Sequence, residues 1–247
     1  MPLTPTTASE LKSLATHYNT KDFIKDDPVQ FPHRFSENRD IEVSAFVTAW
    51  ISWGNRKQII RTAEHIHSDI LQGKPFAYLQ SQHWRNYQDD AQCFYRTVKY
   101  SDFHNLMERL YDVYQHFDTL EDCVLSQLHN GVADPAVALS TIFHNIAGIA
   151  DAQKSSPCKR LWFFLRWMVR QDGIVDLGVW KNISPSTLLI PLDTHVHHVA
   201  QAMGITSRKS ADIKTAREIT NYFKHIFPDD PALGDFALFA YGIEHGI

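Results

Sequence analysis

Residues 188–199 read Leu188-Leu189-Ile190-Pro191-Leu192-Asp193-Thr194-His195-Val196-His197-His198-Val199 and join a stiff apolar segment to the start of a helix. Val196, Val199 and Met203 share one face at helical spacing, and Gly204 marks the expected end of this helix. Asp193 therefore occupies the N-cap position, where a carboxylate satisfies backbone amides of the first turn. A negative charge held rigidly at a helix N-terminus is also well placed for catalysis. The segment therefore leaves two roles open for Asp193, helix capping and catalysis.

Helical periodicity continues on both sides of this segment. Apolar residues recur at helical spacing between turn residues, which predicts helices over residues 41–53, 59–70, 103–117, 120–128, 137–147, 157–170, 211–227 and 236–243. Alternating patterns typical of strands are scarce. The sequence therefore predicts an all-α fold.

The helix predicted at 157–170 contains a second residue of interest, Lys159. Ser156 is expected to cap this helix, with Pro157 at its first position and Lys159 in its first turn. The helix dipole disfavours a cation there, and apolar neighbours should lower the pKa of the amine. A neutral lysine is a nucleophile that can form a Schiff base, although an exposed lysine can simply tolerate this position. The polar face of this helix is expected to consist of Arg160, Arg166 and Arg170.

Composition and charge limit the classes of protein to which this chain can belong. The 247 residues suit one large domain or two modest ones, and the formal net charge is −4. Residues 154–224 nevertheless hold 11 Lys and Arg against 5 Asp and Glu, a local net charge of +6. This basic third would attract a polyanion, or it is a solvated face balanced by acidic surroundings.

Other features of the chain indicate a reducing compartment. Cys93, Cys123 and Cys158 are odd in number and far apart in sequence, which supports neither a disulfide framework nor a Cys-x-x-Cys metal site. Residues 1–10 are polar without a signal-peptide pattern, and no apolar run is long enough to cross a bilayer. We therefore expect a cytoplasmic protein, most simply a monomer, with no role at a membrane.

Three segments together resemble the helix-hairpin-helix DNA glycosylase/lyase superfamily, the endonuclease III-like group that also includes archaeal 8-oxoguanine glycosylases. Residues 189–204 are similar to the segment that carries the catalytic carboxylate of the superfamily, at Asp193. Residues 156–169 occupy the place of its hairpin and of the helix that bears the catalytic lysine, at Lys159. Residues 42–66 are similar to its first barrel helices, whose connecting turn wedges into DNA. The whole chain also resembles an uncharacterised bacterial family within or near that superfamily, through Asp27 to Phe35, Trp53 to Arg56 and Pro191 to His195.

The resemblance implies an architecture and a chemistry. It implies two helical domains with a cleft between them, a barrel-like domain at 41–160 and a second domain formed by 1–40 plus 161–247. It implies a base-excision glycosylase, with or without lyase activity, for duplex DNA with a lesion, an oxidised purine being favoured. Asp193 would stabilise the oxocarbenium-like sugar, and Lys159 would attack it and form a Schiff base. The residues expected to contact DNA are Trp53, Asn55, Arg56, Arg160, His195 and His198, and Trp53 or Trp162 would stack on the base.

The chain also departs from the pattern of the superfamily. Ser155 to Cys158 replaces the Gly-x-Gly hairpin whose amides contact a DNA phosphate, and His198 stands where arginine is usual. No four-cysteine motif follows, so no iron–sulfur cluster or other cofactor is expected. These departures favour an alternative, a nucleic-acid-binding protein that keeps the glycosylase fold without catalysis.

The histidines of residues 195–198 allow a metal site as a further hypothesis. His195 and His198 would share a helix face near Asp193, but they lack the i, i+4 spacing common to helical metal ligands, and no third ligand is evident. We therefore expect no metal. His195 would instead form a hydrogen bond at the helix start while His197 faces solvent.

Overall fold

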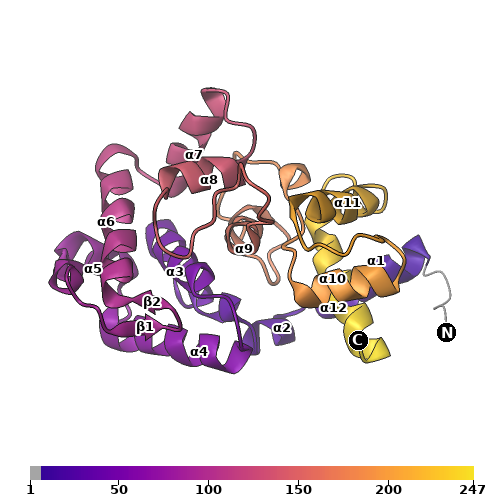
Figure 1. Ribbon diagram of the computed structural model, residues 1–247, viewed down its shortest axis with the longest axis horizontal. Helices are drawn as coiled ribbons and strands as arrows, with labels where there is room; N and C mark the ends of the chain where they lie inside the picture. Colours follow the sequence, from indigo (N-terminus) through magenta and orange to yellow (C-terminus); the bar gives the residue numbers. More distant parts are fainter. Residues whose placement is uncertain (1–6) are drawn as a thin grey trace. The chain divides into compact units, whose positions relative to one another are not determined.

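The computed structural model describes residues 7–247, and residues 1–6 of the expected second domain lie outside the described part. The described residues form an all-α fold with one short β-hairpin (Figure 1). They divide into two compact units: unit 1 comprises the segment up to Lys25 together with Ala152–Ile247, and unit 2 comprises Asp26–Asp151. None of the helices described has the length and apolar character needed to cross a membrane.

Unit 2 is a helical bundle built around one enclosed helix. In α3, Asn38–Trp50, every residue from Ile41 to Trp50 is buried, including the polar ones, so the helix is covered on all sides. The other elements of unit 2 are η1 (Pro28–Gln30), η2 (Pro32–Arg34), α4 (Arg56–His65), the π-helical turn η3 (Ile66–Ile70), α5 (Pro75–Ser81), η4 (His83–Tyr87), β1 (Cys93–Tyr95), β2 (Val98–Lys99), α6 (Tyr100–His116), α7 (Leu120–His129) and α8 (Pro135–Ile142).

Residues 27–35 belong to unit 2, whereas the resemblance to the superfamily implied that residues 1–40 belong to the second domain. Phe31 is completely buried, and its ring stacks on His67 with the centroids 4.9 Å apart. The imidazole of His67 is itself fixed, because Nε2 lies 2.7 Å from Ser44 Oγ and Nδ1 lies 2.7 Å from the carbonyl oxygen of Ala63. Burial lowers the pKa of His67 to about 4, so the ring is neutral at pH 7.

Unit 1 is organised around α9, Lys159–Val169. Its other elements are α1 (Ala8–Tyr18), α2 (Lys21–Lys25), η5 (Pro185–Thr187), α10 (Thr194–Ala202), α11 (Ile213–Lys224), η6 (Pro231–Leu233) and α12 (Gly234–His245). Helix α12 packs against both α1 and α10. Eight of the eleven residues of α9 are buried. This helix is therefore a core element, as its wide apolar face predicts.

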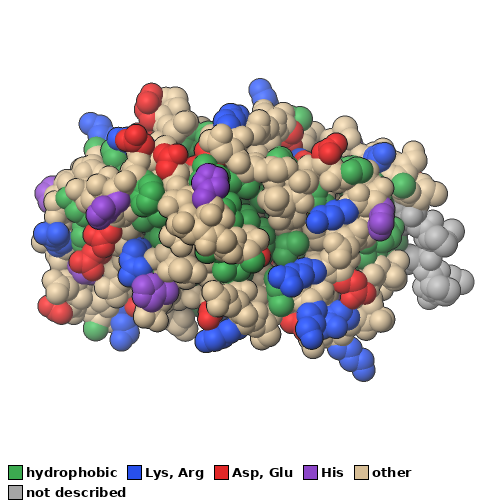
Figure 2. Space-filling view, turned by 90° about the horizontal axis from the view of Figure 1, so that it is seen from above, with side chains coloured by type: hydrophobic (Ala, Val, Ile, Leu, Met, Phe, Trp, Pro, Cys, Tyr) green, Lys and Arg blue, Asp and Glu red, His purple; other side chains and the backbone are tan. Residues whose placement is uncertain are grey.

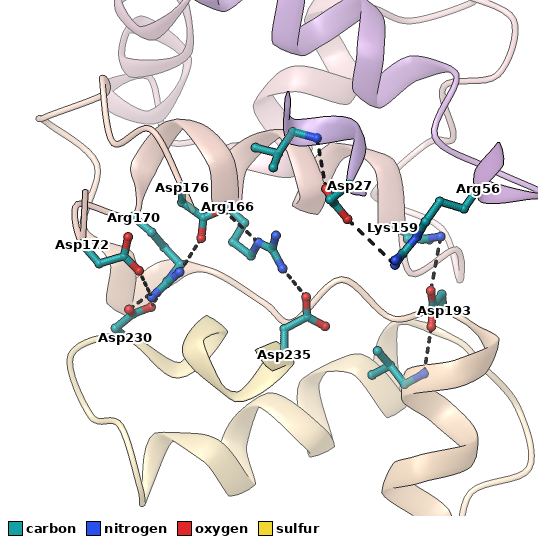
Figure 3. Close-up of polar contacts among 12 residues, drawn as sticks. Asp27, Arg56, Lys159, Arg166, Arg170, Asp172, Asp176, Asp193, Asp230 and Asp235 are labelled. Carbon is teal, nitrogen blue, oxygen red and sulfur yellow. Dashed lines mark hydrogen bonds and ion pairs between the residues drawn. The ribbon is translucent and has the colours of Figure 1, made fainter. Parts of the chain in front are cut away.

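Arg166 and Arg170 correct one expectation, because they are buried rather than a polar face. Their side chains are 2% and 1% exposed, and each forms an ion pair with Asp176, which is also buried. Arg166 also pairs with Asp235 of α12, and Arg170 pairs with Asp230 at 2.9 Å. Burial alone would lower the pKa of Arg170, but the surrounding carboxylates outweigh it and raise that pKa. The two arginines thus join α9 to the segments that precede and begin α12 (Figure 3).

Two helix boundaries also differ from the expected ones. Helix α9 begins at Lys159 instead of Pro157, because Cys158 adopts a left-handed conformation with φ 48° and ψ 40°. Helix α8 ends at Ile142 rather than residue 147, and Asn145 has a left-handed φ of 62°. A left-handed cysteine carries no clear sequence signal, which explains the first difference, whereas asparagine is common at positive φ and Asn145 was a usable signal for the second.

Candidate active site

Asp193 is the N-cap of α10, as the sequence predicts. Its Oδ1 accepts a hydrogen bond from the backbone N–H of Val196 at 2.8 Å, and its backbone oxygen accepts one from His197 at 2.9 Å. The apolar segment before it is fixed as well, because the N–H of Ile190 donates to Thr220 Oγ1 at 3.0 Å. The carboxylate therefore has one oxygen engaged in capping and its position set from both sides.

Lys159 is the first residue of α9 and follows a tight turn. The left-handed Cys158 presents its carbonyl oxygen to the N–H groups of Leu161 and Trp162, at 3.0 and 3.2 Å. The turn is attached to α11, since the carbonyl oxygen of Ser155 accepts a hydrogen bond from the N–H of Ile213 at 3.0 Å. This local geometry fixes the point from which the Lys159 side chain emerges.

The two residues meet, although each opens a different helix of unit 1. Lys159 Nζ lies 3.4 Å from Asp193 Oδ2, and the two side chains face one another (Figure 3). They are 27% and 30% exposed, so neither is sealed in the core and solvent reaches both. Lys159 Nζ also lies 4.9 Å from the centroid of the Phe163 ring, one helical turn further along α9. An amine, a carboxylate and a half-buried aromatic ring thus share one accessible position.

Phe163 is a residue that the sequence reasoning missed, and Trp162 is one that it placed wrongly. Trp162 is only 2% exposed, so its ring belongs to the core and is not available to stack on a base. Phe163 is half-buried and lies on the Lys159 face of the helix. The spacing from 159 to 163 was a usable signal, because residues four apart in a helix share a face. Arg160, the next residue after Lys159, is also half-buried.

The histidines of α10 have separate environments. His195 Nε2 is buried beside Gly242 of α12 and has no hydrogen-bond partner among residues 7–247, so this nitrogen does not form the expected hydrogen bond. His197 is buried rather than facing solvent, and its Nε2 lies 2.8 Å from the carbonyl oxygen of Arg208. His198 is exposed. Across residues 7–247, no group of three or more His, Cys, Asp or Glu side chains converges to hold a metal ion.

Comparison with known families matches most of the chain. The model of the DUF2400 family, described as a protein of unknown function, matches residues 27–244 and so includes Lys159, Phe163 and Asp193. The chain belongs to the DUF2400 family. No curated protein and no solved structure matches it. Membership in DUF2400 assigns no activity to this chain.

In this DUF2400 protein, the Trp53–Arg56 turn connects α3 to α4 within unit 2. Asn55 caps α4, and its side-chain oxygen accepts hydrogen bonds from the N–H groups of Lys57 and Gln58 at 3.0 and 3.4 Å. Arg56 is half-exposed and its guanidinium lies 3.9 Å from Asp27 Oδ2. Trp53 is half-buried, with its ring edge-on to Tyr95 of β1 at 5.7 Å. Gly54, Asn55 and Arg56 are thus the solvent-facing residues of the turn.

Proposed function

We propose that this protein is a base-excision DNA glycosylase with lyase activity and that Lys159 and Asp193 are its catalytic residues. The observation that carries this proposal is the distance of 3.4 Å between Lys159 Nζ and Asp193 Oδ2 at an accessible position. Binding to nucleic acid alone requires neither a lysine nor a carboxylate in that relation. Covalent catalysis at an anomeric carbon needs both a nucleophile and a negative charge beside it.

The roles of the two residues follow from their geometry. Once a base has been flipped out of the duplex, the carboxylate of Asp193 would stabilise positive charge that develops on the sugar ring as the glycosidic bond breaks. The leaving base retains the electron pair of that bond and takes up a proton. Lys159, after losing one ammonium proton to solvent, would donate its nitrogen lone pair to the anomeric carbon of the sugar. The bond from that carbon to the ring oxygen then breaks, the ring oxygen keeps the electron pair and takes up a proton from the nitrogen, and a protonated Schiff base remains. Capping of α10 by Asp193 Oδ1 holds the carboxylate in position throughout.

The Phe163 ring would form one wall of the space in which the base is held. Its centroid lies 4.9 Å from Lys159 Nζ, so a planar base that contacts the ring also lies close to the amine. Aromatic side chains bind flat heterocycles by stacking, which contributes about 1–3 kcal/mol per base.

The charge of unit 1 supports a polyanionic substrate. The segment 154–224, which contains Lys159, Asp193 and all of α11, has a local net charge of +6. On the exposed face of α11, Lys214, Arg217 and Lys224 lie along one stripe at helical spacing. Lys and Arg side chains, in blue, are visible at several positions on the face that Figure 2 shows. Such a surface would attract the phosphates of DNA.

Borohydride trapping tests the proposal directly. Duplex oligonucleotides that carry 8-oxoguanine, uracil or an abasic site are incubated with the protein and sodium borohydride, which reduces a Schiff base to a stable adduct. We expect an adduct with the unaltered chain, none with Lys159→Ala, and an unchanged yield with Lys209→Ala, which removes another exposed lysine of unit 1. An adduct that persists in Lys159→Ala would overturn the role of this lysine. Absence of both adduct and base release on all three duplexes would overturn catalysis.

Non-catalytic binding of nucleic acid remains the second candidate, and one local feature favours it. Pro157 has no N–H group, and the N–H of Cys158 lies 3.2 Å from Ser156 Oγ, so these positions offer few amides to a phosphate. A glycine hairpin would expose its amides instead. Retained duplex binding without adduct or base release would establish this second function.

A further inference from the structure

Arg96 occupies a backbone position that does not suit an arginine. It is the first residue of the two-residue turn between β1 and β2, in which Tyr95 pairs with Val98. Its φ is +55°, in the left-handed region. Two-residue hairpin turns with positive φ favour asparagine, aspartate or glycine, because other side chains crowd the backbone there. The requirements of the turn therefore do not explain the arginine.

The side chain of Arg96 lies over the Trp53–Arg56 turn. Its guanidinium carbon is 4.5 Å from the centroid of the Trp53 ring. Gly54, with φ +97°, has room for this guanidinium because it lacks a side chain, and a Cβ built there would overlap Arg96 Nη1. The guanidinium thus lies against the solvent-facing turn that already presents Asn55.

The hairpin does not need Arg96 in order to stay on the turn. The hydroxyl group of Tyr95 donates a hydrogen bond to the backbone oxygen of Trp53 at 2.6 Å, and the two rings are in edge contact. A buried tyrosine with a hydrogen bond is sufficient to join the two segments. Arg96 itself is exposed.

Arg96 differs in its electrostatic partners from three other arginines of unit 2. Arg34 pairs with Glu64 at 2.6 Å, Arg39 pairs with Asp118 at 3.0 Å, and Arg56 lies 3.9 Å from Asp27. Within residues 7–247, Arg96 forms no ion pair with a carboxylate. A guanidinium that rests on an aromatic ring keeps N–H donors at its edge, and their planar fork matches the oxygens of a phosphate.

We propose that Arg96 binds a backbone phosphate of duplex DNA at the Trp53–Arg56 turn. The inference rests on the proposed function in taking DNA as the partner. It assigns the strain at Arg96 to recognition, because backbone strain at an exposed residue is typical of a binding position. The proposal also gives the β-hairpin a role, because the hairpin places the guanidinium of Arg96 beside the Trp53–Arg56 turn.

The decisive variant is Arg96→Asn, because asparagine suits the left-handed turn and removes only the guanidinium. Binding to a fluorescent duplex is measured by anisotropy between 50 and 300 mM salt, roughly the range in which phosphate contacts dominate the affinity. We expect roughly tenfold weaker binding at the lower salt concentrations, a salt slope smaller by about one, and an unchanged or higher melting temperature. Arg96→Lys should keep most of the salt slope because the charge remains.

Arg85→Asn is the matched control, since Arg85 is also an exposed arginine of unit 2 that lies over a tryptophan, with its guanidinium carbon 5.4 Å from the Trp84 centroid. It should leave duplex binding unchanged. Unaltered affinity and salt slope in Arg96→Asn would overturn the proposal. A lower melting temperature with an unchanged salt slope would also overturn it, because that result would show that Arg96 serves packing and not binding. Failure of the unaltered chain to bind duplex would overturn it too. A chain that binds through Arg96 but forms no borohydride adduct would refute only the lyase.

Discussion

Lys159 Nζ lies 3.4 Å from Asp193 Oδ2, and the two residues open successive helices, α9 and α10, of unit 1. Both side chains are about three-tenths exposed, so the ion pair contributes little to stability, roughly 0–1 kcal/mol. A helix-starting lysine is also unfavourable with respect to the helix dipole. Stability therefore accounts poorly for this arrangement, which supports the catalytic role that we propose for the two residues.

Asp193→Asn should separate the catalytic role from the capping role. Asparagine caps helices about as well as aspartate, so the free energy of unfolding should change by less than about 1 kcal/mol. Base release and adduct formation should fall by roughly a hundredfold or more, because the negative charge beside the sugar is lost. Asp134→Asn is the matched control: Asp134 caps α8 and accepts from the N–H of Val137 at 2.9 Å, in unit 2. Equal activity losses in the two variants would contradict a catalytic Asp193.

Arg170→Met should destabilise unit 1 strongly. The guanidinium is 1% exposed and lies among Asp172, Asp176 and Asp230, so its removal leaves the buried Asp176 with Arg166 as its remaining cation and takes the cation from the two other, partly buried carboxylates. We expect a loss of about 3–5 kcal/mol in the free energy of unfolding. Arg39→Met removes an exposed pair with Asp118 and should cost less than about 1 kcal/mol. Urea unfolding measures both, and similar losses would show that burial of the Arg170 cluster has no special cost.

His67 should make unit 2 sensitive to mild acid. Burial lowers its pKa from 6.5 to about 4, so the unfolded chain binds a proton more readily than the folded one between these values. The contribution of neutral His67 to the free energy of unfolding is complete above about pH 6.5 and decreases as the pH falls toward 4. At pH 5 the free energy of unfolding should be lower by about 2 kcal/mol. Urea midpoints at pH 7 and pH 5, with hydrogen exchange to locate the transition in residues 26–151, measure this effect. His67→Gln should reduce the change in the urea midpoint between pH 7 and pH 5. If the variant shows the same change as the unaltered chain, other groups cause the acid sensitivity.

Gly242→Ala should destabilise unit 1 despite the higher helix propensity of alanine. A Cβ at Gly242 would lie 2.5 Å from His195 Cε1 and 2.9 Å from Val199 Cγ2, so α12 could not keep its present contact with α10. Overpacking of this kind typically costs about 1–3 kcal/mol, which exceeds the gain of about 1 kcal/mol from propensity. The double variant Gly242→Ala/His195→Ala relieves the overlap and should recover much of the loss in thermal unfolding. A single variant as stable as the unaltered chain would show that the ring moves aside.

Much of the secondary structure could be read from local patterns. The apolar spacing after Asp193 predicts the capped helix that the structure contains, and the dense apolar face of 161–169 predicts a buried helix. The left-handed turns at Cys158 and Arg96 could not be foreseen, because neither residue type signals positive φ. The same lack of a local signal hid the β-hairpin and the contact of Arg96 with Trp53.

The sequence by itself determined the helical fold and the position of Asp193 as a helix cap, because both depend on neighbours within a few residues. Only the tertiary structure decided that Lys159 meets Asp193, that Phe163 lies beside the amine while Trp162 is buried, and that Arg166 and Arg170 lie inside the core. These outcomes depend on which helix faces which within unit 1. A pattern of spacing fixes the face of each helix but not the partner that covers it.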